Sequence, residues 1–363
     1  MRVFDFAVSG AGVFGAWIAR ELRQSGASVI LMDAWGPAHS RASSGGESRI
    51  IRMGYGADGI YTRMAMRSLV RWREVAAPLF RRTGVLWMAR DGDAYSEATR
   101  QTLHAADAPH EILSAGEIAR RYPQMAVPDG ITFGIFEPES GAILARRGVA
   151  AVVDDFVAAG GVYRQASADG VHAGTHIYAC GAWLAKIFPD LLATRIYPTR
   201  QEVFFFAPPP GDPRFAPPHM PVWIDFTDPR GPYGFPDLES RGVKFAFDRH
   251  GPPFDPDTGD RTVSGVSVRA ARDFLQQRFP ALRDAPLTEA RVCQYENTSN
   301  GDLLIDRHPE RPNVWLAGGG SGHGFKHAPA VAEYLRGVLL DGAPPEPRFS
   351  LAAKQHRQQR EVH

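Results

Sequence analysis

The feature that most constrains this chain is a glycine-rich hexapeptide near its N-terminus, Gly10-Ala11-Gly12-Val13-Phe14-Gly15. The apolar run Val3–Val8 before it indicates a buried strand, and residues 10–24 indicate a helix. The first glycine permits a tight turn, the second lets the backbone approach a pyrophosphate, and the third lets the helix pack on the strand. With the apolar run Val29–Met32 that follows, the pattern predicts a βαβ unit and an α/β fold with a parallel sheet.

A carboxylate stands where a bound dinucleotide would place a ribose. Asp33 ends the second apolar run, 23 residues after Gly10, and can accept hydrogen bonds from the ribose hydroxyls. A carboxylate there suits an unphosphorylated ribose, which favours FAD or NAD over NADP. The helix N-terminus at Gly12, Val13 and Phe14 adds unpaired N–H groups and the helix dipole for phosphate binding. The alternative is a glycine-rich turn without a ligand, which this full context disfavours.

The composition is that of a globular protein with balanced charge. In 363 residues, 41 Lys and Arg oppose 40 Asp and Glu, so the net charge is +1. This balance gives no electrostatic basis for binding nucleic acid or a membrane surface. No segment reaches the ~18–20 consecutive apolar residues of a membrane helix, and two cysteines are too few for a disulfide framework or a four-thiolate metal site. We therefore expect a soluble, cytoplasmic enzyme without a metal ion.

A polar turn with two arginines follows the βαβ unit. Ser43 and Ser44 begin it, and Arg49 and Arg52 flank two isoleucines. Arginines that are partly buried need an anionic partner, so this turn predicts contact with an anionic ligand. The alternative is a solvated loop with exposed arginines.

A second glycine-rich turn, Gly318–Lys326, follows the apolar run Val314–Ala317 and precedes a predicted helix over residues 328–340. So many glycines before a helix predict close approach of the backbone to a ligand, and a second such turn in one chain favours a cofactor clamp. The residues expected to contact the cofactor there are Gly320, Gly322, Gly324, Phe325 and Lys326.

The remaining patterns predict two interleaved domains. Tyr61–Leu113 is mostly helical in pattern, whereas alternating strands dominate after residue 177, as at Glu202–Phe206 and Val243–Phe247. This order predicts a Rossmann-like nucleotide-binding domain interleaved with a strand-rich α+β substrate domain. We expect the first domain to hold residues 1–75, 140–195 and 300–350, and the second to hold residues 76–139 and 196–299.

Together these motifs resemble the monomeric sarcosine oxidase and N-methyltryptophan oxidase group of the D-amino-acid-oxidase-like FAD flavoproteins. The resemblance covers nearly the full length, and several separate motifs carry it in the right order. They are the dinucleotide fingerprint with Asp33, the stretch ending in Arg49-Ile50-Ile51-Arg52, Tyr233-Gly234-Phe235-Pro236, Gly242-Val243-Lys244, Val292-Cys293-Gln294-Tyr295 and Gly322-His323-Gly324-Phe325-Lys326. The fold that it implies is a Rossmann-like FAD-binding domain with an interleaved substrate domain.

The resemblance implies a role for each matching residue. Cys293 matches the cysteine that tethers the flavin ring through an 8α-thioether, and Lys244 matches the lysine beside the flavin that activates dioxygen. Arg52 and Lys326 match the pair that binds the substrate carboxylate. Arg49 matches an arginine packed over the flavin ring.

The substrate pocket shows both matches and departures. Tyr233 and Tyr295 match pocket aromatics of the family. Asp248 stands where sarcosine oxidase has a pocket histidine, and Gly45 stands where it has another histidine. Because an acid in place of a base changes the charge of the pocket, Asp248 is counted as a substrate-binding residue and the sarcosine assignment stays open.

The function that the resemblance implies is FAD-dependent oxidation of an amino acid to an imine, with reduction of O₂ to H₂O₂. The amine can be N-methyl, cyclic imino or primary. Two alternatives stay open: a flavin dehydrogenase that passes electrons to a non-oxygen acceptor, and a binding or assembly protein with an idle FAD. Lys244 argues against the first, and the pair Arg52 and Lys326 argues against the second. We expect a monomer whose partners are a small amino acid and O₂.

Overall fold

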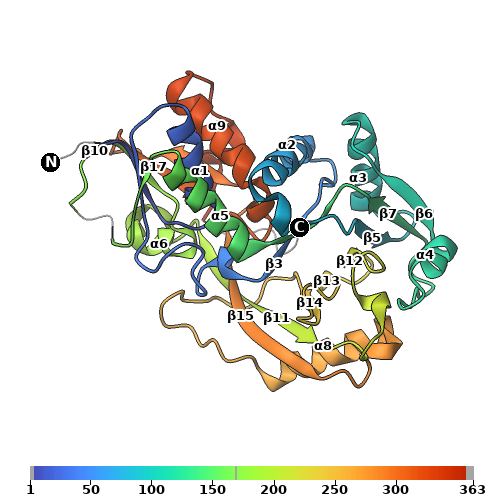
Figure 1. Cartoon of the computed structure of the whole chain (residues 1–363). Coiled ribbons are helices and arrows are strands. Elements are labelled where there is room, and N and C mark those ends of the chain that lie inside the picture. Colours follow the sequence, from blue (N-terminus) through green and yellow to red (C-terminus); the bar gives the residue numbers. More distant parts are fainter. Residues whose placement is uncertain (1–3, 168–169, 357–363) are drawn as a thin grey trace.

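Two large β-sheets and a small one organise the chain, which the computed structural model describes over residues 4–167 and 170–356 (Figure 1). The first sheet has the strand order β16-β17-β10-β1-β2-β9, and every pair except β16–β17 is parallel. Its strands are β1 (Phe4–Ser9), β2 (Val29–Met32), β9 (Val162–Arg164), β10 (Ala173–Tyr178), β16 (Leu304–Arg307) and β17 (Val314–Gly318). β2 is buried along its whole length, because a parallel strand inside such a sheet is covered on both faces.

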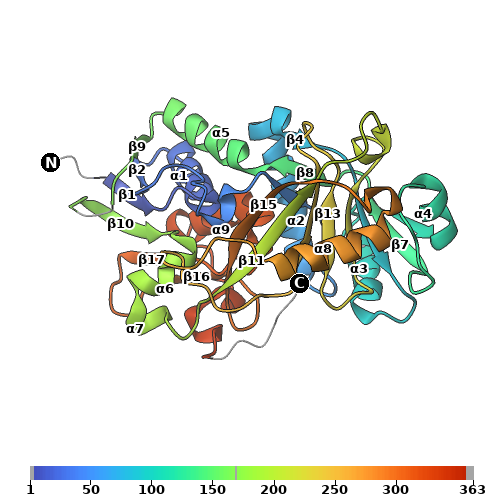
Figure 2. The same cartoon turned by 90° about the horizontal axis from the view of Figure 1, so that it is seen from below.

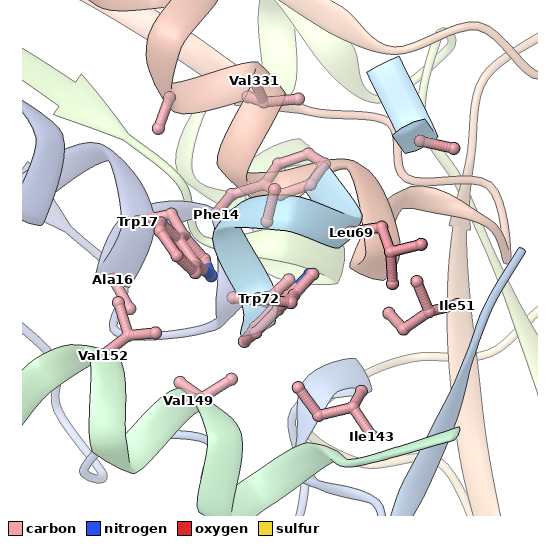
Figure 3. Close-up of a cluster of buried hydrophobic side chains, with 14 of the residues drawn as sticks. Phe14, Ala16, Trp17, Ile51, Leu69, Trp72, Ile143, Val149, Val152 and Val331 are labelled. Atoms are coloured by element: carbon pink, nitrogen blue, oxygen red, sulfur yellow. The ribbon is translucent and has the colours of Figure 1, made fainter. Parts of the chain in front are cut away.

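Four helices pack on one another beside this sheet (Figure 1). They are α1 (Val13–Gln24), α2 (Gly59–Ala76), α5 (Ala145–Ala158) and α9 (Ala328–Leu340). Trp17 of α1 and Trp72 of α2 meet edge to face, with ring centroids 5.0 Å apart, inside the cluster of Figure 3. An aromatic pair of this kind contributes ~0.5–1.5 kcal/mol beyond the burial of its surface. This core fixes α1, whose N-terminus faces the nucleotide cavity described below.

The second sheet has the order β15-β11-β14-β13-β12-β5-β7-β6. Its strands are β5 (Val85–Ala89), β6 (Glu111–Ser114), β7 (Phe133–Glu137), β11 (Tyr197–Phe206), β12 (Val222–Asp225), β13 (Pro232–Phe235), β14 (Val243–Phe247) and β15 (Leu287–Asn297). Helix α8 (Gly265–Arg278) crosses this sheet (Figure 2), and its Phe274 stacks on Phe245 of β14 at 5.2 Å. Because side chains alternate along a strand, Lys244 points to the opposite face.

The third sheet is small and carries one of the arginines of interest. It consists of β3 (Ser48–Ile51), β8 (Gly141–Leu144) and β4 (Phe80–Arg81), with β8 in the middle. Arg49 lies on β3, and Arg52 follows the end of that strand. Lys244 of the second sheet donates a hydrogen bond to the carbonyl of Ser48, which ties the two sheets together. The remaining α-helices of the described residues are α3 (Ala94–Ala105), α4 (Ala115–Arg121), α6 (Leu184–Ile187) and α7 (Pro189–Leu192). None of the helices that the structure describes has the length and apolar character needed to span a membrane.

The predicted α/β architecture is confirmed. Tyr61–Leu113 is mostly helical as predicted, because α2 and α3 make up more than half of it, but β4, β5 and β6 interrupt these helices and were not predicted. All five residues of β5 are buried, and the strand lies between β12 and β7 inside the second sheet. A short continuous apolar run has no periodicity that separates a buried strand from a buried helix. The residue boundaries of the two domains stay a prediction.

Candidate active site

The first glycine-rich turn lies where β1 meets α1. Gly10 has φ +99°, and a Cβ atom on it would lie 2.5 Å from the carbonyl oxygen of Ala179. A Cβ atom on Gly15 would lie 1.7 Å from the carbonyl oxygen of Gly10, so the helix packs directly on the turn. The N-terminus of α1 has no side-chain cap at Gly12. The N–H of Val13 donates to the hydroxyl of Ser44 at 3.2 Å, whereas those of Phe14 and Gly15 have no acceptor among the described residues and are available to an anion.

This turn opens into a cavity of about 480 Å³. The predicted cofactor residues that line it are Gly10, Gly12, Val13, Phe14, Asp33, Ser43, Ser44, Arg49, Gly320, Gly322, Gly324 and Phe325. Asp33 is held firmly, because one carboxylate oxygen accepts the N–H of Ala11 at 2.8 Å and the other accepts those of Trp35 and Gly36. The two glycine-rich turns, far apart in sequence, thus share one cavity.

The chemistry of the cavity wall suits a dinucleotide. The hydroxyls of Ser9 and Ser43 and the amide nitrogen of Gln294 are buried without a hydrogen-bond partner among the described residues. All three residues line the cavity. Buried polar groups are normally paired, so these three indicate a ligand with several hydrogen-bonding groups. FAD, with its diphosphate and its ribityl and ribose hydroxyls, meets that requirement.

Two residues of this cavity have titration properties that the motifs did not predict. Glu296 accepts the N–H of Gly319 at 2.9 Å, and burial raises the pKa of its carboxyl to about 7. Burial, followed by the nearby charge of Asp33, raises the pKa of Cys180 to about 12. Cys180 therefore stays a thiol at ordinary pH.

A second cavity adjoins the first. Arg49, Tyr295, Gly322 and Phe325 line both. The other residues predicted for catalysis, substrate binding or the flavin tether line only the second cavity. They are Arg52, Tyr233, Lys244, Asp248, Cys293 and Lys326. Every residue predicted for catalysis, substrate binding or the flavin tether thus reaches this single space. Gly45 does not line it, and a Cβ atom there would lie 2.0 Å from the carbonyl oxygen of His39, so no larger residue fits in this backbone.

Arg49 lies between the two cavities and beside Cys293. Its guanidinium donates to the carbonyl of Ser48 at 2.8 Å and to the carbonyl of Ser43. It also lies 3.6 Å from the sulfur of Cys293. Cys293 is on β15 and is half-buried, and it lines the second cavity beside Arg49, which lines both.

Lys244 is a buried basic side chain that contacts no carboxylate among the described residues. Its Nζ donates to the carbonyl of Ser48 at 2.8 Å and lies 4.3 Å from the ring centre of Phe235. Burial, followed by the charge of Arg49, holds the pKa of Lys244 well below its usual value. Its protonation state therefore depends on what occupies the cavity.

Arg52 and Lys326 form a second cationic group in the same space. The guanidinium of Arg52 lies between the rings of Tyr55 and Trp87, 4.5 and 4.6 Å from their centres. Lys326 donates to the carbonyl of His323 at 3.1 Å. Both cations are buried, and within the described chain no carboxylate oxygen lies within 4 Å of either. Two buried cations without a counter-ion indicate an anionic ligand.

A buried glutamate that the sequence patterns did not single out holds the turn after Arg52. Glu137, at the end of β7, accepts the N–H groups of Met53 at 2.6 Å and Gly54 at 3.1 Å. It also accepts the indole N–H of Trp87 at 2.9 Å. Because Trp87 stacks on Arg52, one carboxylate fixes both the backbone and the ring that position the guanidinium.

Asp248 contributes the opposite charge to the cavity. The hydroxyl of Tyr295 donates to its carboxylate at 2.7 Å. Burial, followed by the charge of Asp248, raises the pKa of both Tyr295 and Tyr233, so both phenols stay neutral at ordinary pH. The pocket therefore has cations on one wall and a hydrogen-bonded carboxylate on another.

A Rossmann-like sheet, a dinucleotide cavity and an adjoining cavity with cationic and acidic walls define a flavin-dependent oxidoreductase. The chain belongs to the FAD dependent oxidoreductase family, whose sequence profile matches residues 5–337. It is therefore an enzyme that uses FAD.

Comparison with individual proteins confirms the predicted resemblance. The chain is 31% identical to a monomeric sarcosine oxidase of Streptomyces avermitilis over 95% of each chain. It is 28% identical to an N-methyl-L-tryptophan oxidase of Yersinia pestis, over 96% of this chain and 99% of that protein. Among solved structures, an L-proline dehydrogenase from P. horikoshii matches with a TM-score of 0.84 at 18% identity, covering 96% of this chain and 97% of that one. This last match confirms the fold.

Proposed function

We propose that this enzyme oxidises the amine of an amino acid to an imine and reduces O₂ to H₂O₂. The observation that carries the proposal is the pair of buried basic side chains, Arg52 and Lys326, on the wall of the cavity beside the FAD site. The oxidase names of the relatives in Streptomyces and Yersinia support the same reaction class. FAD held by the residues of the first cavity would supply a two-electron acceptor for the substrate and a two-electron donor for O₂.

The chain's own residues orient the substrate. Arg52 offers a planar fork suited to a carboxylate, and Lys326 adds a point charge beside it. Asp248 and Tyr295, hydrogen-bonded to each other, offer acceptors for the amine or for a distal donor group of the substrate. The imine leaves and is hydrolysed by water.

Two finer parts of the proposal concern the flavin. Cys293 would tether the ring through a thioether, which its sulfur beside Arg49 at the junction of the two cavities supports. Lys244 would stand beside the ring as the site of reaction with O₂. We also propose that the enzyme is a monomer and that it acts in the cytoplasm. Light scattering measures the oligomeric state.

A peroxide-coupled screen of the purified yellow protein against amino and imino acids tests the function. We expect peroxide with at least one amino acid, and at least about tenfold weaker carboxylate binding in Arg52→Ala, since a charge-assisted hydrogen bond contributes ~1.5–3 kcal/mol. Decarboxylated amines oxidised as fast as the amino acids, with Arg52→Ala unaffected, would point to a simple amine oxidase. Flavin bleaching without peroxide would point to a dehydrogenase.

A further inference from the structure

A short chain of hydrogen-bonding side chains leads from the substrate cavity into the protein core. Nζ of Lys326 lies 2.6 Å from the hydroxyl oxygen of Tyr55, and that oxygen lies 2.8 Å from Nε2 of His327. The three residues are 5%, 2% and 0% exposed. Only Lys326 lines the cavity. The sequence motifs pointed to Lys326 alone.

Lys326 lies in surroundings that disfavour a second positive charge. The guanidinium of Arg52, which is permanently charged, lies 4.5 Å from the centre of the Tyr55 ring, and Nζ of Lys326 lies 5.1 Å from the same centre. The titratable groups that face the chain from its neighbours are Arg52, Tyr61, Glu137, Asp248 and His323. Glu137 and Asp248 are already hydrogen-bonded elsewhere and do not contact the lysine. Burial, followed by the charge of Arg52, holds the pKa of Lys326 well below its usual value.

The surroundings of His327 indicate the direction of the hydrogen bonds. Its Nδ1 is buried and has no hydrogen-bond partner among the described residues. A buried N–H without an acceptor is rarer than a buried acceptor without a donor, so the ring proton belongs on Nε2. Nε2–H then donates to Tyr55. The hydroxyl of Tyr55 can donate its own proton to Lys326 only if that amine is neutral, whereas an ammonium can only donate to the hydroxyl oxygen.

We propose that Tyr55 and His327 are positioning residues that hold Lys326 as a neutral amine in the substrate-free enzyme, so that binding of a carboxylate takes up one proton at Nζ. On binding, Nζ gains a proton from solvent and becomes an ammonium paired with the carboxylate. The hydroxyl group of Tyr55 then rotates, so that its oxygen accepts a hydrogen bond from the ammonium. This inference rests on the proposed function, because it takes Arg52 and Lys326 as the carboxylate site.

Proton uptake can be measured directly on the flavin-loaded protein. Propanoate, a carboxylate without an amine, is titrated by calorimetry in two buffers with different ionisation enthalpies and by the flavin absorbance across pH. We expect uptake of about one proton between the free and bound pKa of Lys326, and an affinity that falls up to tenfold per pH unit in that window. Lys326→Met should bind propanoate more weakly, through Arg52, without uptake.

The direction of the hydrogen bond is tested by Tyr55→Phe. A donor to the neutral amine favours that form, so its removal should raise the pH at which affinity begins to fall by about one unit. If the hydroxyl instead accepts from an ammonium in the free enzyme, the same substitution lowers that pH. His327→Phe removes the donor to Tyr55 and should act in the same direction as Tyr55→Phe, which keeps the test available if one variant does not fold.

Tyr61→Phe is the matched control. Its buried ring packs beside Tyr55, but its hydroxyl donates to Asp302 at 2.9 Å and not to the lysine, so the pH midpoint should not move. Propanoate binding without proton uptake, uptake that persists in Lys326→Met, or a downward shift in Tyr55→Phe would each overturn this inference and leave the proposed function standing. Wild-type protein that binds no carboxylate at any pH would overturn both.

Discussion

At the scale of single residues, Lys244 shows how surroundings set chemistry. The described residues place no carboxylate within 4 Å of its Nζ, and burial followed by Arg49 lowers its pKa. A positive charge held close to the flavin favours electron transfer to O₂ by stabilising the negative charge that develops. The same lysine loses that charge at a lower pH than an exposed lysine does.

Lys244→Met should therefore slow reoxidation of the reduced flavin by about a hundredfold or more, while anaerobic reduction by substrate changes less. In the wild type, reoxidation should slow as pH rises through the lowered pKa, and the variant should lack this dependence. Stopped-flow absorbance measures both half-reactions. Lys186→Met, at an exposed lysine paired with Asp255 and Asp257, is the control. Equal reoxidation in both variants would move the oxygen site elsewhere.

The proposed bond between Cys293 and the flavin can be tested by denaturing the protein. If its sulfur is bonded to the flavin, protein precipitated with acid stays yellow, and Cys293→Ser releases the colour to the supernatant. Cys180→Ser is the matched control, because it changes the other cysteine, whose thiol donates to the carbonyl of Ser9 at 3.3 Å. Flavin that leaves the wild-type protein on denaturation would contradict the tether.

At the scale of elements, the end of β7 supports the turn that follows β3. Glu137→Ala would leave three buried N–H donors without an acceptor: those of Met53 and Gly54 and the indole of Trp87. At ~1–3 kcal/mol for each unpaired group, we expect a loss of at least about 3 kcal/mol in the free energy of unfolding. Carboxylate binding should weaken as well, because Arg52 loses its support.

Chemical denaturation and propanoate titration measure these two effects. Glu139→Ala is the control, because Glu139 pairs with Arg73 and Arg82 near the surface, where an ion pair contributes ~1 kcal/mol or less. Similar losses for the two variants would show that Glu137 has no special role.

Elements with local signals could be predicted from the sequence, and those that depend on distant contacts could not. The turn at Gly10 and the strand Val29–Met32 follow from glycine geometry and apolar runs. β5 was not singled out within a segment predicted to be mostly helical, because only its place inside the sheet makes it a strand. Glu137 and His327 gave no local signal, because their partners lie 84 and 272 residues away along the chain. The family motifs named the cavity residues, whereas the side chains behind them came from the structure.

At the scale of the whole molecule, the FAD cavity joins segments from both ends of the chain. Its walls combine the turn after β1, the segment around Cys180 and the turn after β17. A ligand that binds only the folded state stabilises it by RT ln(1 + [L]/Kd), which is ~2.7 kcal/mol at a hundredfold excess over Kd.

Flavin-free Cys293→Ser protein should therefore unfold at a lower temperature than the loaded form, with a Tm that rises with added FAD. Differential scanning calorimetry across an FAD series measures the effect. Riboflavin, which lacks the diphosphate, should raise the Tm less than FAD at equal concentration. A Tm that does not depend on FAD would contradict the proposed role of the cavity in joining these segments.

The strand order of the first sheet also has a consequence for biosynthesis. β1 is flanked by β2 and β10, and β10 by β17, so the sheet is completed in an order that differs from the order of synthesis. On the ribosome, β1 and β2 can pair at once, but the other edge of β1 waits for β10, on the order of ten seconds at usual elongation rates. The last wall of the nucleotide cavity is made only after β17. A nascent chain therefore carries an exposed parallel edge until β10 has been made, and the nucleotide cavity is complete only after β17 and the turn that follows it have been made.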